Sequence, residues 1–265
     1  MAASRVERAA APLAAGTPWP VLAALGALAG AAAVLGGHGL LPPRAAALIA
    51  VAAMNAAFIA TALAWAGAPG AGAVAAGLVL AASGAAAGHP AGAIAYLALP
   101  AWLASLARGG RLVGLGLGAR PPAPALLAGA ALGVGLIAHL ALTVSRTRGY
   151  GFALGPPSVV LSSLAYDVGV NVPCAECFLR GALFNRAQRR WSLHGAMALA
   201  VALGLARYLA DPLLPHASEV LAGAVFYVAL LGMGNCWLFW RWGSLVPGTL
   251  SGILLFEGYR LLVVS

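Results

Sequence analysis

The sequence predicts an all-α integral membrane protein, a polytopic bundle of transmembrane helices, from its composition and its long uncharged stretches. Of its 265 residues, 62% are hydrophobic and only 8% are charged, whereas a soluble domain carries about 25% charged residues. A helix needs roughly 20 apolar residues to cross a bilayer core of about 30 Å. Four stretches without any charged side chain meet or exceed that length, namely 9–43, 45–107, 121–145 and 220–240.

The individual spans follow from these apolar runs and from the glycine and proline breaks between them. The first run is longer than most signal-peptide cores and further spans follow it, so we expect a retained helix there. Two of the predicted spans, the third and fourth, are short and rich in glycine, which makes eight an alternative count. The nine predicted spans are 19–36, 44–66, 70–88, 91–107, 122–144, 159–186, 192–210, 217–240 and 244–264.

The chain is expected to divide into two parts that differ in their intramembrane charge. Residues 1–150 hold transmembrane helices rich in Ala and Gly, whose small side chains let helices approach closely in lipid. Residues 151–265 hold every charged group that we place inside a span, while His139 in the first part is a neutral possibility. Such groups are costly in a membrane and are usually functional, so the site is expected in this second part. They are Asp167, Glu176, Arg180, Arg207, Glu257 and Arg260.

The formal net charge of +9 is explained by basic membrane loops and not by nucleic-acid binding. All fifteen basic residues are arginine, and most lie between the apolar runs. Segments that a cytoplasmic N-terminus would place inside hold nine arginines, against three outside, in agreement with the positive-inside rule. We expect a protein of the bacterial inner membrane with its N-terminus in the cytoplasm. Its expected partners are the lipid bilayer and a membrane protein or peptide substrate.

The three cysteines predict neither a metal site nor a disulfide framework. Cys174 and Cys177 form a CxxC pair, but no second pair or nearby histidine completes four zinc ligands. A buried cysteine behaves as a small hydrophobic residue, and we interpret these two, with Cys236, in that way. We expect no metal and no cofactor.

The segment around Glu176 and Arg180 carries the strongest candidate for a site. Their i, i+4 spacing places both side chains on one helix face, where they can form an ion pair. Pro173 is expected near the start of that helix, since proline is tolerated in a first turn. Asp167 and Asn171 are expected to cap the start of the helix. From spacing alone, the pair has either a structural or a catalytic role.

Glu257 is a further carboxylate within an apolar run. It could pair with Arg207 or Arg180 across the bundle, which would neutralise the cost of both charges.

The C-terminal motifs resemble those of the CPBP family, the CAAX-protease and bacteriocin-processing membrane peptidases. "AECFLRGALFNRAQRR" (175–190) is similar to the family's first motif, which is Glu-Glu, three residues, then Arg-Gly. "ALAVALGLARYLA" (198–210) resembles the span that bears Phe-x-x-x-His. "GNCWLFWRWGSLVPGTLSGILL" (234–255) is similar to the Gly-Ser-Leu-x-x-Pro segment before the third motif, His-x-x-x-Asn. The resemblance covers about residues 155–265 and implies a glutamate, aided by histidines, that activates water against a peptide bond within the membrane.

Several motif positions hold other residues than the family pattern has. With Arg180-Gly181 as the anchor, Ala175 occupies the place of the water-activating glutamate, and Glu176 that of the second glutamate. If the motif is instead aligned on Pro173, Glu176 occupies the position of the first, water-activating glutamate. The remaining departures are Leu203 for Phe, Arg207 for His, Ser251 or Gly252 for the third-motif His, and Leu255 or Phe256 for Asn.

Three functional hypotheses follow from these residues. The first is a CPBP-type membrane protein with a degenerate catalytic site, a pseudoenzyme that binds or scaffolds. The second is an active intramembrane endopeptidase that uses Glu176. The third is an unrelated transporter or channel subunit in which Glu176, Arg207 and Glu257 line a polar path. For a peptidase, the resemblance implies the candidate catalytic residues Glu176, Arg180 and Arg207.

Overall fold

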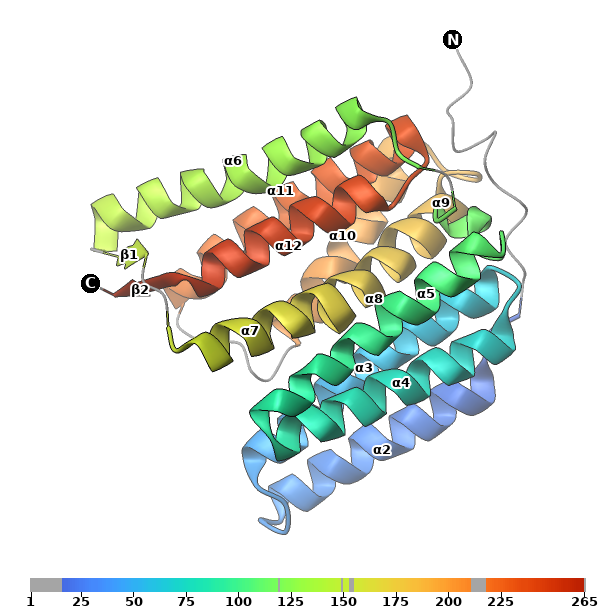
Figure 1. Ribbon diagram of the computed structural model, residues 1–265, viewed down its shortest axis with the longest axis vertical. Helices are drawn as coiled ribbons and strands as arrows, with labels where there is room; N and C mark the ends of the chain where they lie inside the picture. Colours follow the sequence, from blue (N-terminus) through green and yellow to red (C-terminus); the bar gives the residue numbers. More distant parts are fainter. Residues whose placement is uncertain (1–15, 119, 149, 153–154, 211–217, 265) are drawn as a thin grey trace.

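The chain folds into a bundle of helical segments whose axes run roughly parallel, with loops at the two ends (Figure 1). The computed structural model describes residues 16–118, 120–148, 150–152, 155–210 and 218–264. Each of the nine predicted spans contains helix within these ranges. The all-α membrane fold is thus confirmed.

The N-terminal helices begin at prolines. Proline occupies one of the first two positions of α2, α3 and α4, where its missing N–H would be unbonded in any case. A short 3₁₀ segment, η1, leads into α5, and a second one, η2, follows it. The bounds are α2 (Trp19–Gly37), α3 (Pro43–Trp65), α4 (Pro69–Gly88), η1 (Pro90–Leu97), α5 (Ala98–Arg108) and η2 (Val113–Leu115).

The C-terminal part consists of α6 to α12 with a small two-stranded sheet at one end. The strands β1 and β2 pair antiparallel, with Gly151 opposite Val263. The bounds are α6 (Ala123–Arg148), β1 (Tyr150–Phe152), α7 (Pro157–Tyr166), η3 (Asp167–Asn171), α8 (Val172–Glu176), η4 (Cys177–Phe184), α9 (Asn185–Ala187), α10 (Leu193–Leu209), α11 (Ser218–Trp242), α12 (Val246–Arg260) and β2 (Leu262–Val264).

The helix that bears the first motif does not begin at Pro173, so that prediction was wrong. One continuous helix runs from α7 to α9, and Pro173 lies in its interior. A proline there removes a backbone hydrogen bond and crowds the preceding turn. The turn directly before it, η3, is π-helical, and η4 is a second π-helical segment. The wider π turn accommodates the ring, and such turns are frequent at functional sites.

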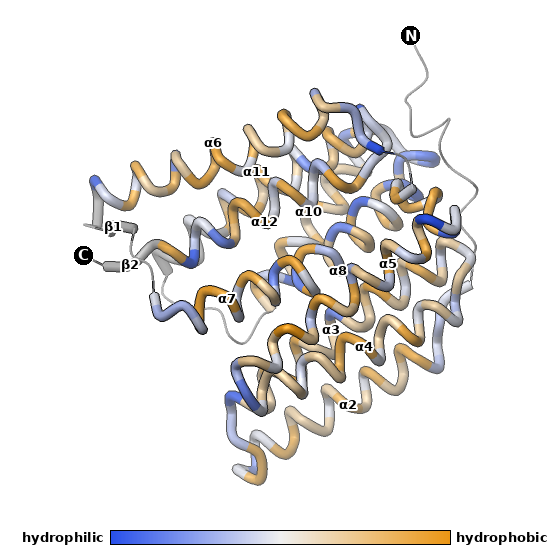
Figure 2. The backbone as a smooth tube through the Cα atoms, viewed as in Figure 1, coloured by the Kyte–Doolittle hydropathy of each residue, from blue (hydrophilic) through white to orange (hydrophobic). Residues whose placement is uncertain are grey.

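Six helices are long and apolar enough to cross a membrane among the described residues, and α10 is a shorter apolar helix. The protein is therefore an integral membrane protein, while the number of crossings remains a prediction. Apolar positions follow the helices along their length, and polar positions gather at the ends and around α8 (Figure 2). The qualifying spans are 19–37, 43–65, 69–88, 90–108, 123–146 and 157–187.

Close helix packing depends on glycines on both sides of residue 150. A Cβ atom on Gly72 of α4 would lie 2.8 Å from the Ala60 carbonyl oxygen of α3. A Cβ on Gly133 of α6 would lie 2.7 Å from the Ser251 carbonyl oxygen of α12. Such contacts let backbones meet in lipid, where packing drives association. Because α6 packs on α11 and α12, the predicted boundary at residue 150 falls between helices in contact, and it remains a prediction.

Candidate active site

The centre of the candidate site is the buried ion pair between Glu176 and Arg180. Arg180 Nη1 lies 3.2 Å from Glu176 Oε1, and the two side chains are 7% and 4% exposed. Glu176 ends α8 and Arg180 lies one turn further in η4, so the helix itself brings the groups together. The predicted pairing and burial of these two charges are confirmed.

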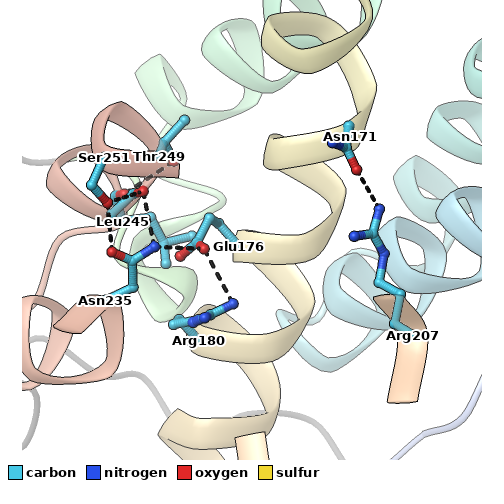
Figure 3. A network of polar contacts seen from close by, with 9 residues as sticks. Asn171, Glu176, Arg180, Arg207, Asn235, Leu245, Thr249 and Ser251 are labelled. Atoms are coloured by element: carbon cyan, nitrogen blue, oxygen red, sulfur yellow. Dashed lines mark hydrogen bonds and ion pairs between the residues drawn. The ribbon is translucent and has the colours of Figure 1, made fainter. Parts of the chain in front are cut away.

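Asn235 of α11 connects this pair to α12, and the sequence analysis missed it. Its Nδ2 donates to Glu176 Oε1 at 3.0 Å and to the Gly248 carbonyl oxygen at 3.1 Å. Ser251 Oγ donates to Asn235 Oδ1 at 2.6 Å. Figure 3 shows this network with residues from three helices pointing toward one another. The available signal was an asparagine inside the uncharged run 220–240.

A small cavity borders the ion pair. Its volume is about 30 Å³, enough for one or two water molecules. Glu176 and Arg180 both line it. Glu176 Oε2 and Arg180 Nε are buried and have no hydrogen-bond partner among the described residues, so polar atoms are available beside this space.

The same cavity brings together the positions at which the three sequence motifs depart from the CPBP pattern. Ala175, Arg207, Gly252 and Phe256 line it together with the ion pair. Among the alternatives for the third motif, Gly252 and Phe256 face the cavity, whereas Ser251 is bonded to Asn235. Three distant segments, α8, α10 and α12, thus converge on one point.

Arg207 contributes to the cavity wall, but its guanidinium is bonded elsewhere. Arg207 Nη2 donates to Asn55 Oδ1 at 2.9 Å and to Asn171 Oδ1 at 2.5 Å. Figure 3 shows it on the other side of the motif helix from the Glu176 network. The structure therefore unites Glu176 and Arg180 directly, and Arg207 only through the cavity that all three line. Leu203, at the Phe position of the second motif, is exposed.

Two other predictions about ionisable groups were wrong. Asp167 and Asn171 lie inside the continuous helix and cap nothing. Asn171 Nδ2 donates to Asp167 Oδ1 at 2.7 Å, and Arg260 Nε donates to Asp167 Oδ2 at 2.8 Å. Glu257 pairs with neither Arg207 nor Arg180.

Glu257 is bonded instead to α7, because it lies near the end of α12, where that helix passes α7. Its Oε2 accepts from Ser163 Oγ at 3.5 Å.

None of the histidines in the described ranges is a hydrogen-bond partner of the ion pair, whereas the Cys236 thiol lies against Arg180. His139 Nδ1 lies 2.7 Å from the Tyr227 hydroxyl. His216 lies outside the described residues, while the other three histidines, His38, His89 and His194, are exposed. The three cysteines are free thiols, and their burial agrees with the prediction. Among the described residues, no three His, Cys, Asp or Glu groups gather as a metal site would require.

Comparison with known proteins supports the resemblance seen in the motifs. Residues 157–254 match the family model described as Type II CAAX prenyl endopeptidase Rce1-like. No curated protein and no solved structure matches the chain. The matched segment covers less than half of the chain and includes the ion pair, Arg207 and Asn235. Within this integral membrane protein, residues 157–254 are therefore similar to the type II CAAX prenyl endopeptidases.

Proposed function

We propose that this protein is a CAAX-peptidase-like membrane protein with a degenerate site, which binds a membrane protein or peptide without cleaving it. The observation that carries this proposal is the lining of the small cavity. Four positions at which the family places its catalytic groups face the same space, and here they hold Ala175, Arg207, Gly252 and Phe256.

None of these four side chains can activate water. Ala175, Gly252 and Phe256 have no polar atom, and the arginine guanidinium stays protonated in proteins and accepts no proton. General-base catalysis requires a group that removes a proton at hydrogen-bond distance. In this proposal the protein keeps the cavity at which the three motifs meet, but other residues replace the groups that would accept a proton there.

Glu176 has a structural role in this proposal. Its Oε1 already accepts from Arg180 and Asn235, and the three groups hold α8, η4 and α11 together. Removing a partner from a buried charge is costly, which explains why the pair persists without catalysis.

A second candidate function, an active endopeptidase that uses Glu176, has one observation in its favour. Glu176 Oε2 has no hydrogen-bond partner among the described residues, and the residue lines a space that can hold water. A buried carboxylate with a free oxygen could act as a general base.

Cleavage assays separate the two functions. Purified protein would be incubated with quenched fluorescent membrane peptides, including one that ends in a prenylated CAAX sequence. We expect no cleavage above the buffer rate from the native protein. Cleavage that is lost in Glu176→Gln and kept in Glu257→Gln, a matched carboxylate variant outside the ion pair, would establish the active peptidase instead.

A gain-of-function variant tests the same proposal from the other direction. The combined substitutions Ala175→Glu, Arg207→His, Gly252→His and Phe256→Asn restore the family's groups around the cavity. We expect measurable cleavage from this fourfold variant. The matched control is the threefold variant that keeps Ala175, and we expect no cleavage from it, because it lacks the water-activating carboxylate.

We also propose that the N-terminus faces the cytoplasm of a bacterial cell. The ends of α5, α9 and α11 lie at the same end of the bundle in Figure 1. These ends and the adjoining loops carry Arg108, Arg111, Arg186, Arg189, Arg190 and Arg241, as the positive-inside rule favours for the cytoplasmic side. Reporter fusions to the loops at each end, active only on one side of the membrane, test this orientation.

A further inference from the structure

A second and much larger cavity lies next to the small one. Its volume is about 1020 Å³, in the range of cavities that hold small-molecule ligands. The first turns of α3 and α7 and the last turns of α4 and α12 form its mouth at one end of the bundle. Arg207, Tyr208 and Phe256 line both cavities and therefore form the wall between them.

Arg207 places a positive charge on the wall of this cavity that has no ion-pair partner within the described ranges, although its guanidinium lies 5.9 Å from the centre of the Phe58 ring. Its two hydrogen-bond acceptors are the neutral amides of Asn55 and Asn171, and its Nε is buried without a partner among the described residues. Asn55 is the thirteenth of the 23 residues of α3, so the guanidinium lies about halfway along a membrane-spanning helix. A charge at that depth is costly unless an opposite charge accompanies it.

The surrounding hydrogen bonds hold this guanidinium in one position. Asn55 Nδ2 donates to the Tyr166 hydroxyl at 3.2 Å, and Asn171 Nδ2 donates to Asp167 Oδ1 at 2.7 Å. With both amide nitrogens engaged as donors, both amide oxygens are directed at Arg207. A donor fixed before binding loses little entropy when a ligand arrives.

The charged side chains that line the cavity in the described part of the chain are all arginines. Arg44 and Arg260 line its mouth, and Arg260 is balanced by Asp167 at 2.8 Å. In the described part of the chain, no Asp or Glu side chain lines the cavity. A ligand with an acidic group would meet Arg44 and Arg260 at the mouth of the cavity and Arg207 at its inner end.

The walls suit an acyl chain better than a peptide. They are built from helices, whose backbone groups are bonded internally, so an extended peptide would find few partners for its own N–H and C=O groups. Two of the four wall serines are also engaged, since Ser162 Oγ donates to the Ser158 carbonyl oxygen at 2.7 Å and Ser163 Oγ to that of Val160 at 2.9 Å. Apolar side chains such as Leu48 and Ala87 line much of the rest.

We propose that the large cavity binds a long-chain fatty acid, with the carboxylate against Arg207 and the acyl chain along the walls formed by α3 and α4. This site is separate from the question of peptide hydrolysis, because it depends on the charge at Arg207 and on the volume of the cavity.

A displacement assay on the whole purified protein in a neutral detergent tests the site. A fluorescent long-chain fatty acid would be bound and then displaced by oleate, by methyl oleate, or by an apolar peptide with a free C-terminus. We expect oleate to displace the probe at least tenfold more effectively than methyl oleate, which has the same chain without the charge. We expect probe binding at least tenfold weaker in Arg207→Gln and unchanged in Arg111→Gln, an exposed arginine at the other end.

Because Arg207→Gln also disturbs the asparagine contacts, a second variant keeps the test independent of folding. Ala87→Trp adds bulk at an exposed helix position on the cavity wall and should abolish probe binding without altering the thermal unfolding of the protein. Equal displacement by methyl oleate, or undiminished binding in a folded Ala87→Trp protein, overturns the proposal. Preferential displacement by the peptide overturns it as well, since the cavity would then be a peptide site.

Discussion

Replacing Arg180 with methionine should destabilise the protein by about 3 kcal/mol. The substitution keeps an unbranched side chain but removes the positive charge next to Glu176. At 3.2 Å, an ion pair has a Coulomb energy of about 5 kcal/mol at an effective dielectric constant of about 20. Removing one partner of a buried pair usually costs about 3–5 kcal/mol, because the other charge stays behind.

The local contacts place the expected value at the lower end of that range. Asn235 continues to donate to Glu176 Oε1 at 3.0 Å, and a hydrogen bond to a charged group contributes about 1.5–3 kcal/mol. Removing the guanidinium also relieves its own burial, since Arg180 Nε has no partner among the described residues. Both effects reduce the net loss.

A double-mutant cycle isolates the pair from other effects of the substitutions. Free energies of unfolding would be measured by denaturant titration in mixed micelles for Arg180→Met, Glu176→Gln and the double variant. Because Glu176→Gln removes the charge that Arg180→Met leaves unpaired, the double variant should be less destabilised than the two single losses added together. We expect a coupling of at least about 1.5 kcal/mol, with the exposed control Arg111→Gln within about 0.5 kcal/mol of the native protein.

The result that contradicts this reasoning is additivity. If the loss in the double variant equals the sum of the two single losses, the charges do not stabilise one another in the folded bundle. The role that we assign to Glu176 as a structural partner would then have no energetic basis.

Three further predictions concern packing and burial. Gly133→Leu should cost about 2 kcal/mol of unfolding free energy by overpacking the α6–α12 contact, whereas Gly135→Leu, with nothing near its Cβ position, should cost little; equal losses would contradict this. Ser251→Ala should cost about 1–3 kcal/mol, because it leaves Asn235 Oδ1 without its 2.6 Å donor, and an unchanged unfolding midpoint would argue against the network. The thiols should resist maleimide until the protein unfolds, since all three are buried, and rapid labelling of the native state would show otherwise; they are Cys174, Cys177 and Cys236.

The features that the sequence predicted well are those set by local spacing and composition. The helices follow from apolar runs, and the Glu176–Arg180 pair follows from the four-residue spacing on one helix. The partners of Arg207 could not be predicted, because Asn55 lies 152 residues away and only the packing of α3 against the motif helix brings it near. Asn235 was missed for the same reason, because it lies 59 residues from Glu176 and only the packing of α11 brings the two side chains together.

The interior position of Pro173 was missed because its accommodation depends on the preceding turn. A proline among apolar residues is typical of a helix start, and nothing in the neighbouring residues distinguishes that case from a π-helical turn. Similarly, the direction in which the Glu257 side chain points depends on where α12 passes α7. The spacing of apolar residues along the sequence carries no information about that crossing.

The two π-helical turns of the motif helix also control its rotational phase. A π turn contains one residue more than an α turn, and one residue corresponds to about 100° of rotation. Shortening η3 by a single residue would therefore swing Asp167 around the axis relative to Glu176. The carboxylates would then no longer face Arg260 and Asn235 at the same time. Length changes in this helix should thus be far less tolerated than substitutions on its outer side.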